Sequence, residues 1–368
     1  ILWRDGSIIR GTRAAQFRNQ TPPFKQRRYT RRVARVAIGA DGTVATIQAE
    51  EKAWGEDPKK GHLYIYDSNG KRQADIAMVG YKYPKDVVVD GKNKLVIVGG
   101  FNTYKHDSPH MKDHPIHMPF LTAFTYDGKV KWAAYDFPAK DVYAMNTYAD
   151  SRVQRLAIGA DGYLYMGGYI HGGDYVWRRD PLDVRKRVDI DVGYDSYTSA
   201  HNMGRGIDQG YFAKYDPLTG QILQGQVLVT RQEPDGGGKP SQIQIKAIQA
   251  DKDGSVYLAG YCERYIKDRD ARRVAGQRVG AYYKPEPYLL VVTPDFRHRK
   301  VWTVFAADQC EAAFWGLGLR NGVAAMVGEL YEGKTIVTDN ALQRTAPRPT
   351  GGYLVVWKPE AEVKGEAD

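Results

Sequence analysis

The sequence predicts an all-β fold, and three features of its 368 residues support this prediction. Short apolar segments with alternating polarity recur along the chain, as in strands that bury one face. Asp-Gly and Asn-Gly dipeptides separate pairs of these segments, which is typical of tight hairpins. No segment has the apolar spacing of a long helix, and no run of about 18 apolar residues exists that would span a membrane. The hydrophobic content of 42% is that of a globular chain.

Five segments repeat one pattern: an apolar strand, a turn containing glycine, and a second apolar strand that ends in small residues. They lie at 32–51, 86–102, 152–171, 244–263 and 313–331. The third of them, RVQRLAIGADGYLYMGGYIH, shows the pattern clearly. Each segment predicts one β-hairpin.

A second hairpin pattern follows four of these segments, with a strand, a turn and a strand that often carries an aromatic residue. Its instances lie at 62–79, 119–137, 210–229 and 287–306. Two hairpins make a four-stranded antiparallel unit. The fifth unit has a third strand at 351–359 and no fourth. The N-terminal ILWRDGSIIRG has the alternation of a strand, so we expect it to complete the fifth unit and leave no open edge.

These units predict a single β-propeller of four-stranded antiparallel blades, five in number, with the N-terminal strand closing the last blade. The predicted parts are a basic N-terminal arm (1–31), the propeller (32–359) and a C-terminal tail (360–368). The blades are expected at about 32–80, 86–138, 152–230, 242–307 and 313–359. A two-sheet sandwich and an open stack of repeats are the alternatives, and a sixth blade stays open.

The phrases GADGYLYMGGY and DKDGSVYLAGY, followed by GYFAKYDPLTGQIL or PYLLVVTPDFRHRKVW, resemble a known repeat. They are similar to the β-propeller repeat of bacterial exported proteins known as the SBBP type. The first hairpin departs from that pattern, since Gln48 stands where the repeat has glycine. The resemblance implies a propeller fold and export to the periplasm, cell surface or medium, but no shared activity. A chain that starts at Ile1 is consistent with removal of a signal peptide and equally with trimming.

The connections between the second and third strands of each unit are long, and we expect them to emerge on one face. They span about 52–61, 103–118, 172–208, 264–286 and 332–350. Just past the second strands stand polar residues at equivalent positions, namely Glu51, Asn102, His171, Glu263 and Tyr331. Such a ring at the mouth of a central channel would bind a cation or polar ligand, or perform acid–base chemistry. Alternatively, it is polar only because a channel mouth is wet.

The second of these connections contains half of the eight histidines of the chain. The four are His106, His110, His114 and His117, with two Met and two Asp among them. These donors suit a divalent metal ion such as Cu or Zn, and no other cofactor is predicted. The alternative is a solvated loop, since Pro109 and Pro115 exclude a helical ligand spacing.

The 172–208 connection combines aromatic residues with basic ones, which suits sugar stacking and carboxylate binding. Trp177 and Arg178 are its predicted ligand-binding residues. If the protein is an enzyme, the candidates are His171 or His201 as base, Tyr194 or Tyr197 as acid, and Arg205 on a carboxylate. The alternative is an ordered lid that buries its aromatic rings.

The two cysteines, Cys262 and Cys310, are both expected near the long connections. A disulfide between them is plausible in an exported protein. Two unpaired buried thiols are the competing interpretation.

The sequence favours a non-catalytic binding or scaffold module whose partner is a protein or an acidic glycan. It contains no nucleophile elbow, P-loop, zincin or kinase motif. A polysaccharide lyase or other glycan-active enzyme is the first alternative, and a structural subunit of a larger extracellular or periplasmic assembly is the second.

The formal net charge of +10 first suggests nucleic-acid binding. However, residues 1–35 hold ten basic residues and one acidic residue, and residues 264–284 hold seven and two. The charge is therefore local, and no nucleic-acid-binding motif accompanies it, so the sequence argues against a nucleic-acid partner.

Overall fold

A computed structural model describes residues 3–4, 7–8, 32–49, 61–78, 83–104, 116–147, 149–172, 175–190, 192–198, 207–341, 343–344 and 350–359. The described chain is nearly all β-structure, as predicted, and its large sheets are antiparallel.

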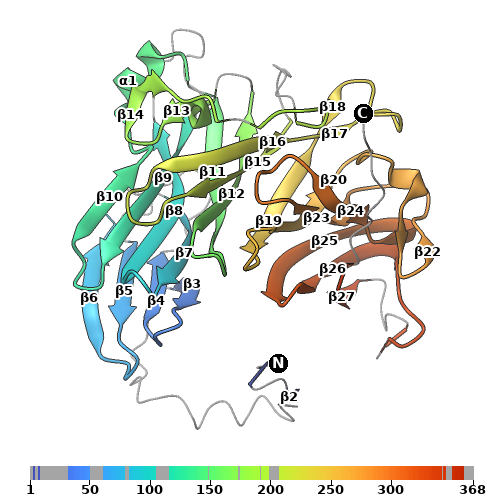
Figure 1. The fold of residues 1–368 in the computed structure, drawn as a ribbon, viewed down its shortest axis with the longest axis horizontal. Helices are drawn as coiled ribbons and strands as arrows, with labels where there is room; N and C mark the ends of the chain where they lie inside the picture. The colour runs from blue at the N-terminus through green and yellow to red at the C-terminus, as the bar shows by residue number, and fades with distance from the viewer. Residues whose placement is uncertain are drawn as a thin grey trace.

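Four sheets have four strands each, and a fifth has three (Figure 1). The first sheet contains β3 (Arg32–Ile38), β4 (Val44–Ala49), β5 (His62–Tyr66) and β6 (Arg72–Ala77). The second contains β7 (Tyr83–Asp90), β8 (Leu95–Tyr104), β9 (Ile116–Thr125) and β10 (Val130–Ala134). The third contains β11 (Asp150–Ile158), β12 (Leu164–His171), β15 (Gln209–Tyr215) and β16 (Ile222–Leu228). The fourth contains β19 (Ile243–Ala250), β20 (Val256–Cys262), β23 (Glu286–Val292) and β24 (Arg299–Val304). The fifth contains β25 (Ala306–Arg320), β26 (Val323–Thr335) and β27 (Gly351–Trp357).

Short elements decorate the connections between these strands. They are the helix α1 (Ala139–Ala144), the 3₁₀ turns η2 (Val176–Arg178) and η3 (Arg269–Ala271), and the pairs β13 (Arg179–Asp180) with β14 (Asp183–Arg187), β17 (Thr230–Arg231) with β18 (Pro240–Ser241), and β21 (Arg273–Val274) with β22 (Gln277–Arg278).

Turn chemistry fixes the hairpins. Gly162 and Gly254 follow Asp in the β11–β12 and β19–β20 turns and have φ of 87° and 80°, a region that glycine adopts without strain. The preceding Asp161 and Asp253 each accept a hydrogen bond from the backbone N–H two residues later, at 3.3 and 2.8 Å.

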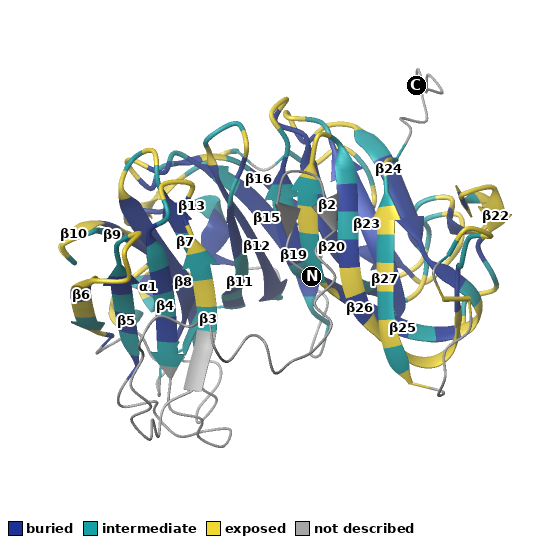
Figure 2. Ribbon diagram, turned by 90° about the horizontal axis from the view of Figure 1, so that it is seen from below, coloured by how far each residue is buried: buried dark blue, intermediate teal, exposed yellow. Residues whose placement is uncertain are grey.

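The first strands of successive sheets contact one another in chain order, from β3 through β7, β11 and β19 to β25. The sheets therefore fan out around a common centre, with their buried residues on the faces between neighbours (Figure 2). The small residues that end the second strands explain how close the sheets lie. A Cβ on Gly99 of β8 would be 2.7 Å from Val153 of β11, and one on Gly167 of β12 would be 2.6 Å from Ile245 of β19. Branched side chains of one sheet thus fill the space above glycines of the sheet before it.

The first and last sheets each have one apolar face that no neighbouring described sheet covers. Val36 of β3 is the equivalent of the buried Leu156 in β11, yet 56% of its surface is exposed. Val327 of β26 is the equivalent of Gly99 and Gly167, and it is 52% exposed. Leu354 and Val356 of β27 are exposed as well, on the same sheet as Val327.

Among the described residues, the last sheet does not contain the predicted closing strand. In the N-terminal segment, β1 (Trp3–Arg4) pairs with β2 (Ser7–Ile8), and among the described strands β27 pairs with β26 alone. The number of blades and the closure of a ring are therefore not confirmed by the structure. The rest of the N-terminal arm and the C-terminal tail from residue 360 lie outside the described residues.

Candidate functional site

Connections that follow strands of the second and third sheets carry short elements along the top of Figure 1, and we call this the loop end. It carries α1, the β13–β14 pair and the β17–β18 pair. The backbone N–H of Tyr135, just before α1, donates to the carbonyl of Pro181 in the β13–β14 turn at 2.7 Å. The backbone of Arg231 in β17 pairs with that of Tyr265 in the connection after β20. Connections from different sheets therefore support one another at this end.

His171 is the last residue of β12 and begins a chain of polar contacts that crosses from the third sheet to the fourth. Its Nδ1 lies 2.8 Å from Asp208 Oδ1. Gln244 Nε2 donates to Asp208 Oδ2 at 2.6 Å, and Lys246 Nζ donates to Gln244 Oε1 at 3.0 Å. The hydrogen bond to Asp208 raises the pKa of His171 above its usual value, although partial burial opposes this.

A second histidine–carboxylate pair joins the second sheet to the third. His117 Nδ1 lies 3.2 Å from Asp150 Oδ2, and the His117 backbone N–H donates to Asp150 Oδ1 at 2.8 Å. Burial acts to raise the pKa of Asp150, but the hydrogen bonds from His117 and the nearby charge of Arg152 outweigh it and lower the pKa. Arg152 contacts His117 and lies over the rings of Phe101 and Tyr169, 4.7 and 5.1 Å from their centres.

These two groups adjoin, because Asp150 is directly opposite His171 in the β11–β12 ladder. We call the following residues the central cluster: His117, Asp150, Arg152, His171, Asp208, Gln244 and Lys246. Lys246 lies over the rings of Tyr261 and Trp315, 5.4 and 5.5 Å from their centres. Burial and then the positive charge of Arg155 lower the pKa of Lys246 to about 8. The cluster thus combines both signs of charge with aromatic faces, and its histidines and carboxylates are only partly buried.

The other members of the predicted polar ring have separate partners. Asn102 is buried and its amide donates to Asp136 at 2.9 Å. Tyr331 donates to Glu329 at 2.8 Å, on the exposed side of β26. Glu263 is partly buried, and its negative charge contributes to the raised pKa of Tyr261. Glu51 lies outside the described residues.

The structure corrects the predicted roles of two aromatic residues in the 172–208 connection. Trp177 is 1% exposed and its ring stacks on Tyr211, with centres 5.2 Å apart. Tyr197 is 4% exposed and its ring meets the Trp302 ring edge-on at 5.4 Å. Both rings serve the core rather than a ligand, because burying such large apolar surfaces stabilises the fold most.

The remaining candidates of that connection are placed as follows. Tyr194 is partly exposed and lies 4.9 Å from the guanidinium of Arg299, and burial raises its pKa to about 12. Arg299 in turn is paired with Asp195. His201 and Arg205 lie outside the described residues.

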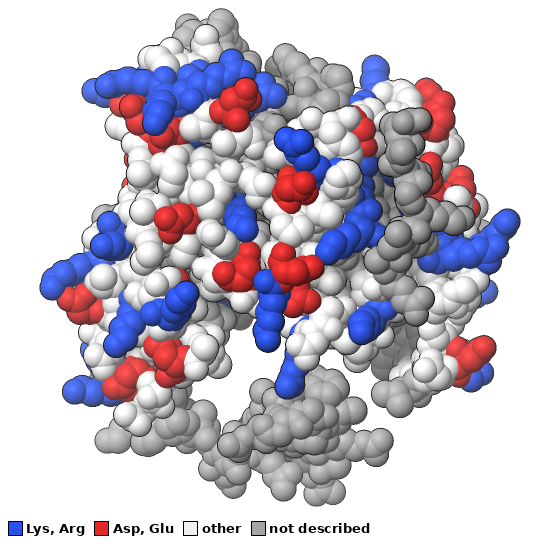
Figure 3. Space-filling model, in the orientation of Figure 1, with Lys and Arg blue, Asp and Glu red and all other residues white. Residues whose placement is uncertain are grey.

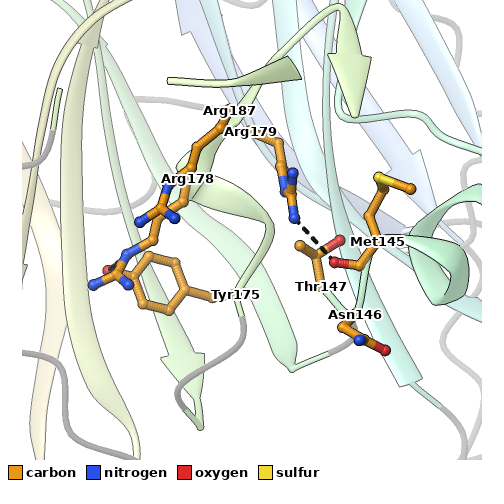
Figure 4. Close-up of a pocket in the computed structure, with 7 residues that line it drawn as sticks. All are labelled: Met145, Asn146, Thr147, Tyr175, Arg178, Arg179 and Arg187. Carbon is orange, nitrogen blue, oxygen red and sulfur yellow. Dashed lines mark hydrogen bonds between the residues drawn. The ribbon is translucent and has the colours of Figure 1, made fainter. Parts of the chain in front are cut away.

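Arg178 lines a pocket between the segment that follows α1 and the connection that carries β13 and β14 (Figure 4). The pocket has a volume of about 320 Å³, and the residues around it are Met145, Asn146, Thr147, Tyr175, Arg178, Arg179 and Arg187. Arg178 Nε donates to the Tyr175 hydroxyl at 2.9 Å, and Arg179 Nη2 donates to the Met145 carbonyl at 3.0 Å.

No group of three or more His, Cys, Asp or Glu side chains suited to a metal ion occurs among the described residues. Of the predicted metal ligands, His106, His110 and His114 are outside them, and His117 is paired with Asp150. In the same part of the chain, no helix is long and apolar enough to cross a membrane.

Both cysteines are buried free thiols. Burial raises the pKa of Cys262, and that of Cys310 to about 12, so both are protonated at neutral pH.

Sequence reasoning missed Asp150, Asp208, Lys246 and Arg187. A signal for Asp150 was present, since extending the hairpin register by two residues beyond 152–171 places it opposite His171. For Lys246, the alternation in the QIQIK segment puts it on the same side of its strand as Gln244.

Comparisons with known proteins show similarities of shape and no family. No family model matches the chain, and no curated protein matches its sequence. Among solved structures, a GH43_1 enzyme from Xanthomonas citri is similar at 10% identity over 81% of both chains, with a TM-score of 0.38. A Synechocystis apocarotenoid oxygenase is similar at 11% identity over 86% of this chain and 61% of that chain, with a TM-score of 0.39. A structure of the Dos1 propeller is similar at 9% identity over 83% and 69%, with a TM-score of 0.33.

Proposed function

We propose that this chain is a non-catalytic β-propeller binding module that holds a polar partner, an acidic glycan or a protein, at its loop end. The central cluster carries this proposal, because two adjoining hydrogen-bonded groups bring partly exposed side chains from three successive sheets together there. Polar groups that are mutually satisfied are held in place before a ligand arrives, which lowers the entropic cost of binding. Cationic Arg152 and Lys246 beside aromatic rings suit an acidic partner with apolar faces, such as a uronate chain.

The test is calorimetric titration of the protein with tetragalacturonate and, separately, with neutral xylotetraose. Lys246→Gln and Asp208→Asn are expected to change the affinity for the acidic oligomer at least about fivefold, since each removes a charge-assisted contact. Asp127→Asn is the matched control, because this carboxylate pairs with Lys129 in the exposed turn between β9 and β10. Equal affinity of all three variants for the acidic oligomer would contradict a glycan site at the central cluster.

The alternative function is a polysaccharide lyase or other glycan-active enzyme. The His171–Asp208 pair favours it, because a histidine held by a carboxylate can act as a general base. Absorbance of unsaturated product from uronate polymers, abolished in His171→Ala, would establish catalysis and replace the binding proposal.

A further alternative, a subunit of a larger assembly, is supported by the uncovered faces at Val36 and Val327. It predicts elution well above 41.4 kDa on size exclusion.

We extend the proposal to the closure and location of the protein. The proposed arrangement has five blades, with the N-terminal strand closing the last blade along β27. The alternation of ILWRDGSIIRG supports the closing strand, and the SBBP-type resemblance supports a propeller and export. The uncovered Val36 and Val327 support the six-blade alternative instead. Deletion of residues 1–31 tests whether this segment completes the fold, because a lost closing strand lowers the midpoint of thermal unfolding by several degrees.

A further inference from the structure

Three arginines, Arg178, Arg179 and Arg187, line the pocket beside α1 and make it positively charged. We propose that it is a binding subsite for the carboxylate or phosphate group of a ligand about as large as one sugar ring. The inference deepens the proposed function, because the pocket lies at the loop end and would receive an acidic unit of the partner.

Among the described residues, the lining of the pocket is basic and includes no carboxylate. Three guanidinium groups border it, and its other lining residues are neutral. Two acidic residues in the elements around the pocket are paired with lysine or arginine, since Asp141 of α1 lies 3.9 Å from Arg185 and Asp180 of β13 lies 3.3 Å from Lys186. Figure 3 shows the Lys and Arg side chains gathered over β13 and β14, at the upper left. Residues 175–188 hold five basic and two acidic residues, a net charge of +3.

Two of the three arginines lie directly opposite each other in a strand pair. Arg179 and Arg187 are direct partners in the β13–β14 ladder. Like charges in directly opposite positions destabilise an antiparallel pair, and water screens this repulsion only in part. An anion bound in the pocket would offset this unfavourable pairing and form charge-assisted hydrogen bonds with the guanidinium groups that border it.

The pocket is preformed. Figure 4 shows Arg179 extended toward Met145, where its Nη2 donates to the carbonyl at 3.0 Å. Arg178 is held by the Tyr175 hydroxyl at 2.9 Å. The adjoining Trp177 is locked in the core by its stack on Tyr211, so the wall beneath the arginines is rigid. Because the cations are already positioned, binding an anion orders little additional chain.

The neutral residues and the volume indicate the rest of the ligand. A volume of about 320 Å³ is at the lower end of small-molecule sites and accommodates one ring with its substituents. Asn146 and Thr147 stand on the side of the pocket away from Arg178 and Tyr175 and bring an amide and a hydroxyl to the pocket. These groups suit sugar hydroxyls, so a uronate or a sugar phosphate fits both walls.

The experiment titrates the protein with three monomeric probes at low ionic strength: glucuronate, glucose 6-phosphate and glucose. The two anions are expected to bind at least about tenfold tighter than glucose, and the tighter of them identifies the anionic group. Arg187→Gln is expected to weaken binding of that anion about tenfold. Arg185→Gln removes the same charge from the same strand, at a residue outside the pocket lining, and is expected to change the affinity less than about twofold.

The proposal is overturned if glucose binds as tightly as the anions, if neither anion binds at about 10 mM, or if Arg185→Gln weakens binding as much as Arg187→Gln. Arg187 is exposed, so its replacement is not expected to unfold the chain, and an unchanged thermal midpoint verifies this. Monomeric probes report on this pocket alone, whereas the tetrasaccharide titration with central-cluster variants tests the proposed function. If one of the two experiments gives a negative result, the other can therefore still be interpreted.

Discussion

Replacing Glu286 by Gln tests how the fourth sheet holds a buried charge. Glu286 begins β23 with no exposed surface, and the guanidinium of Arg269 in η3 contacts both of its carboxylate oxygens, with Nε 2.8 Å from Oε2. Arg269 is 1% exposed and is bonded on its other side to Asp270 at 2.6 Å. Glu286→Gln therefore leaves a buried guanidinium with one surface carboxylate as its charge partner.

Breaking a buried ion pair on one side costs about 3–5 kcal/mol, because the remaining charge is desolvated without compensation. The glutamine keeps one acceptor oxygen, so we expect a loss of about 3 kcal/mol in the free energy of unfolding. Urea denaturation followed by tryptophan fluorescence measures it. Lys284→Gln is the control, since this lysine bridges the partly exposed Glu311 and Glu332 and is expected to cost less than about 1 kcal/mol.

A loss below about 1 kcal/mol in Glu286→Gln would refute the reasoning, because it would show that Arg269 is solvated or finds another partner. The double replacement Arg269→Met with Glu286→Leu sharpens the test. It removes both charges and is expected to recover most of the loss, since an apolar pair of similar volume replaces a costly ionic one.

Three further predictions follow from the packing, the central cluster and the thiols. Gly167→Val is expected to lower the free energy of unfolding by about 3 kcal/mol or more, because its branched side chain would overlap Ile245 of the next sheet; a thermal midpoint equal to that of the unchanged chain would contradict the packing. The pKa of His171 read by NMR is expected above about 6.5 and to fall in Asp208→Asn; its stabilising contribution is present at low pH and lost as pH rises through the raised pKa. Both cysteines are expected to react with a thiol reagent only after unfolding, and detection of fewer than two thiols would indicate a disulfide.

The strands were predictable because their signals are local. A turn such as that at Asp161 and Gly162 is set by a side chain that bonds its own backbone and by one residue that accepts positive φ, and both can be read from neighbouring letters. The period-2 alternation beside it then assigns the faces of the strands.

The long connection after β12 was less predictable, because composition does not determine which side of a ring meets the core. Trp177 and Tyr197 lie among charged residues, as a ligand platform would, and yet both are buried against the third and fourth sheets. Similarly, Arg179 and Arg187 are eight positions apart, and only the register of a short strand pair places them opposite each other. Such contacts depend on tertiary packing.

The uncovered faces of the first and last sheets differ from each other, and this difference has a consequence for self-association. One end presents the protruding Val36 of β3, and the other presents Val327, Leu354 and Val356 on a flat sheet. If the Val36 face of one copy packs against the Val327 face of another, the two copies meet head to tail. This contact is heterologous and has no two-fold axis. Such a contact leaves one face of each kind still available, so it either closes into a ring of copies or continues as a fibre. A single charged side chain at Val327 would interrupt both outcomes while leaving the contacts between the other sheets intact.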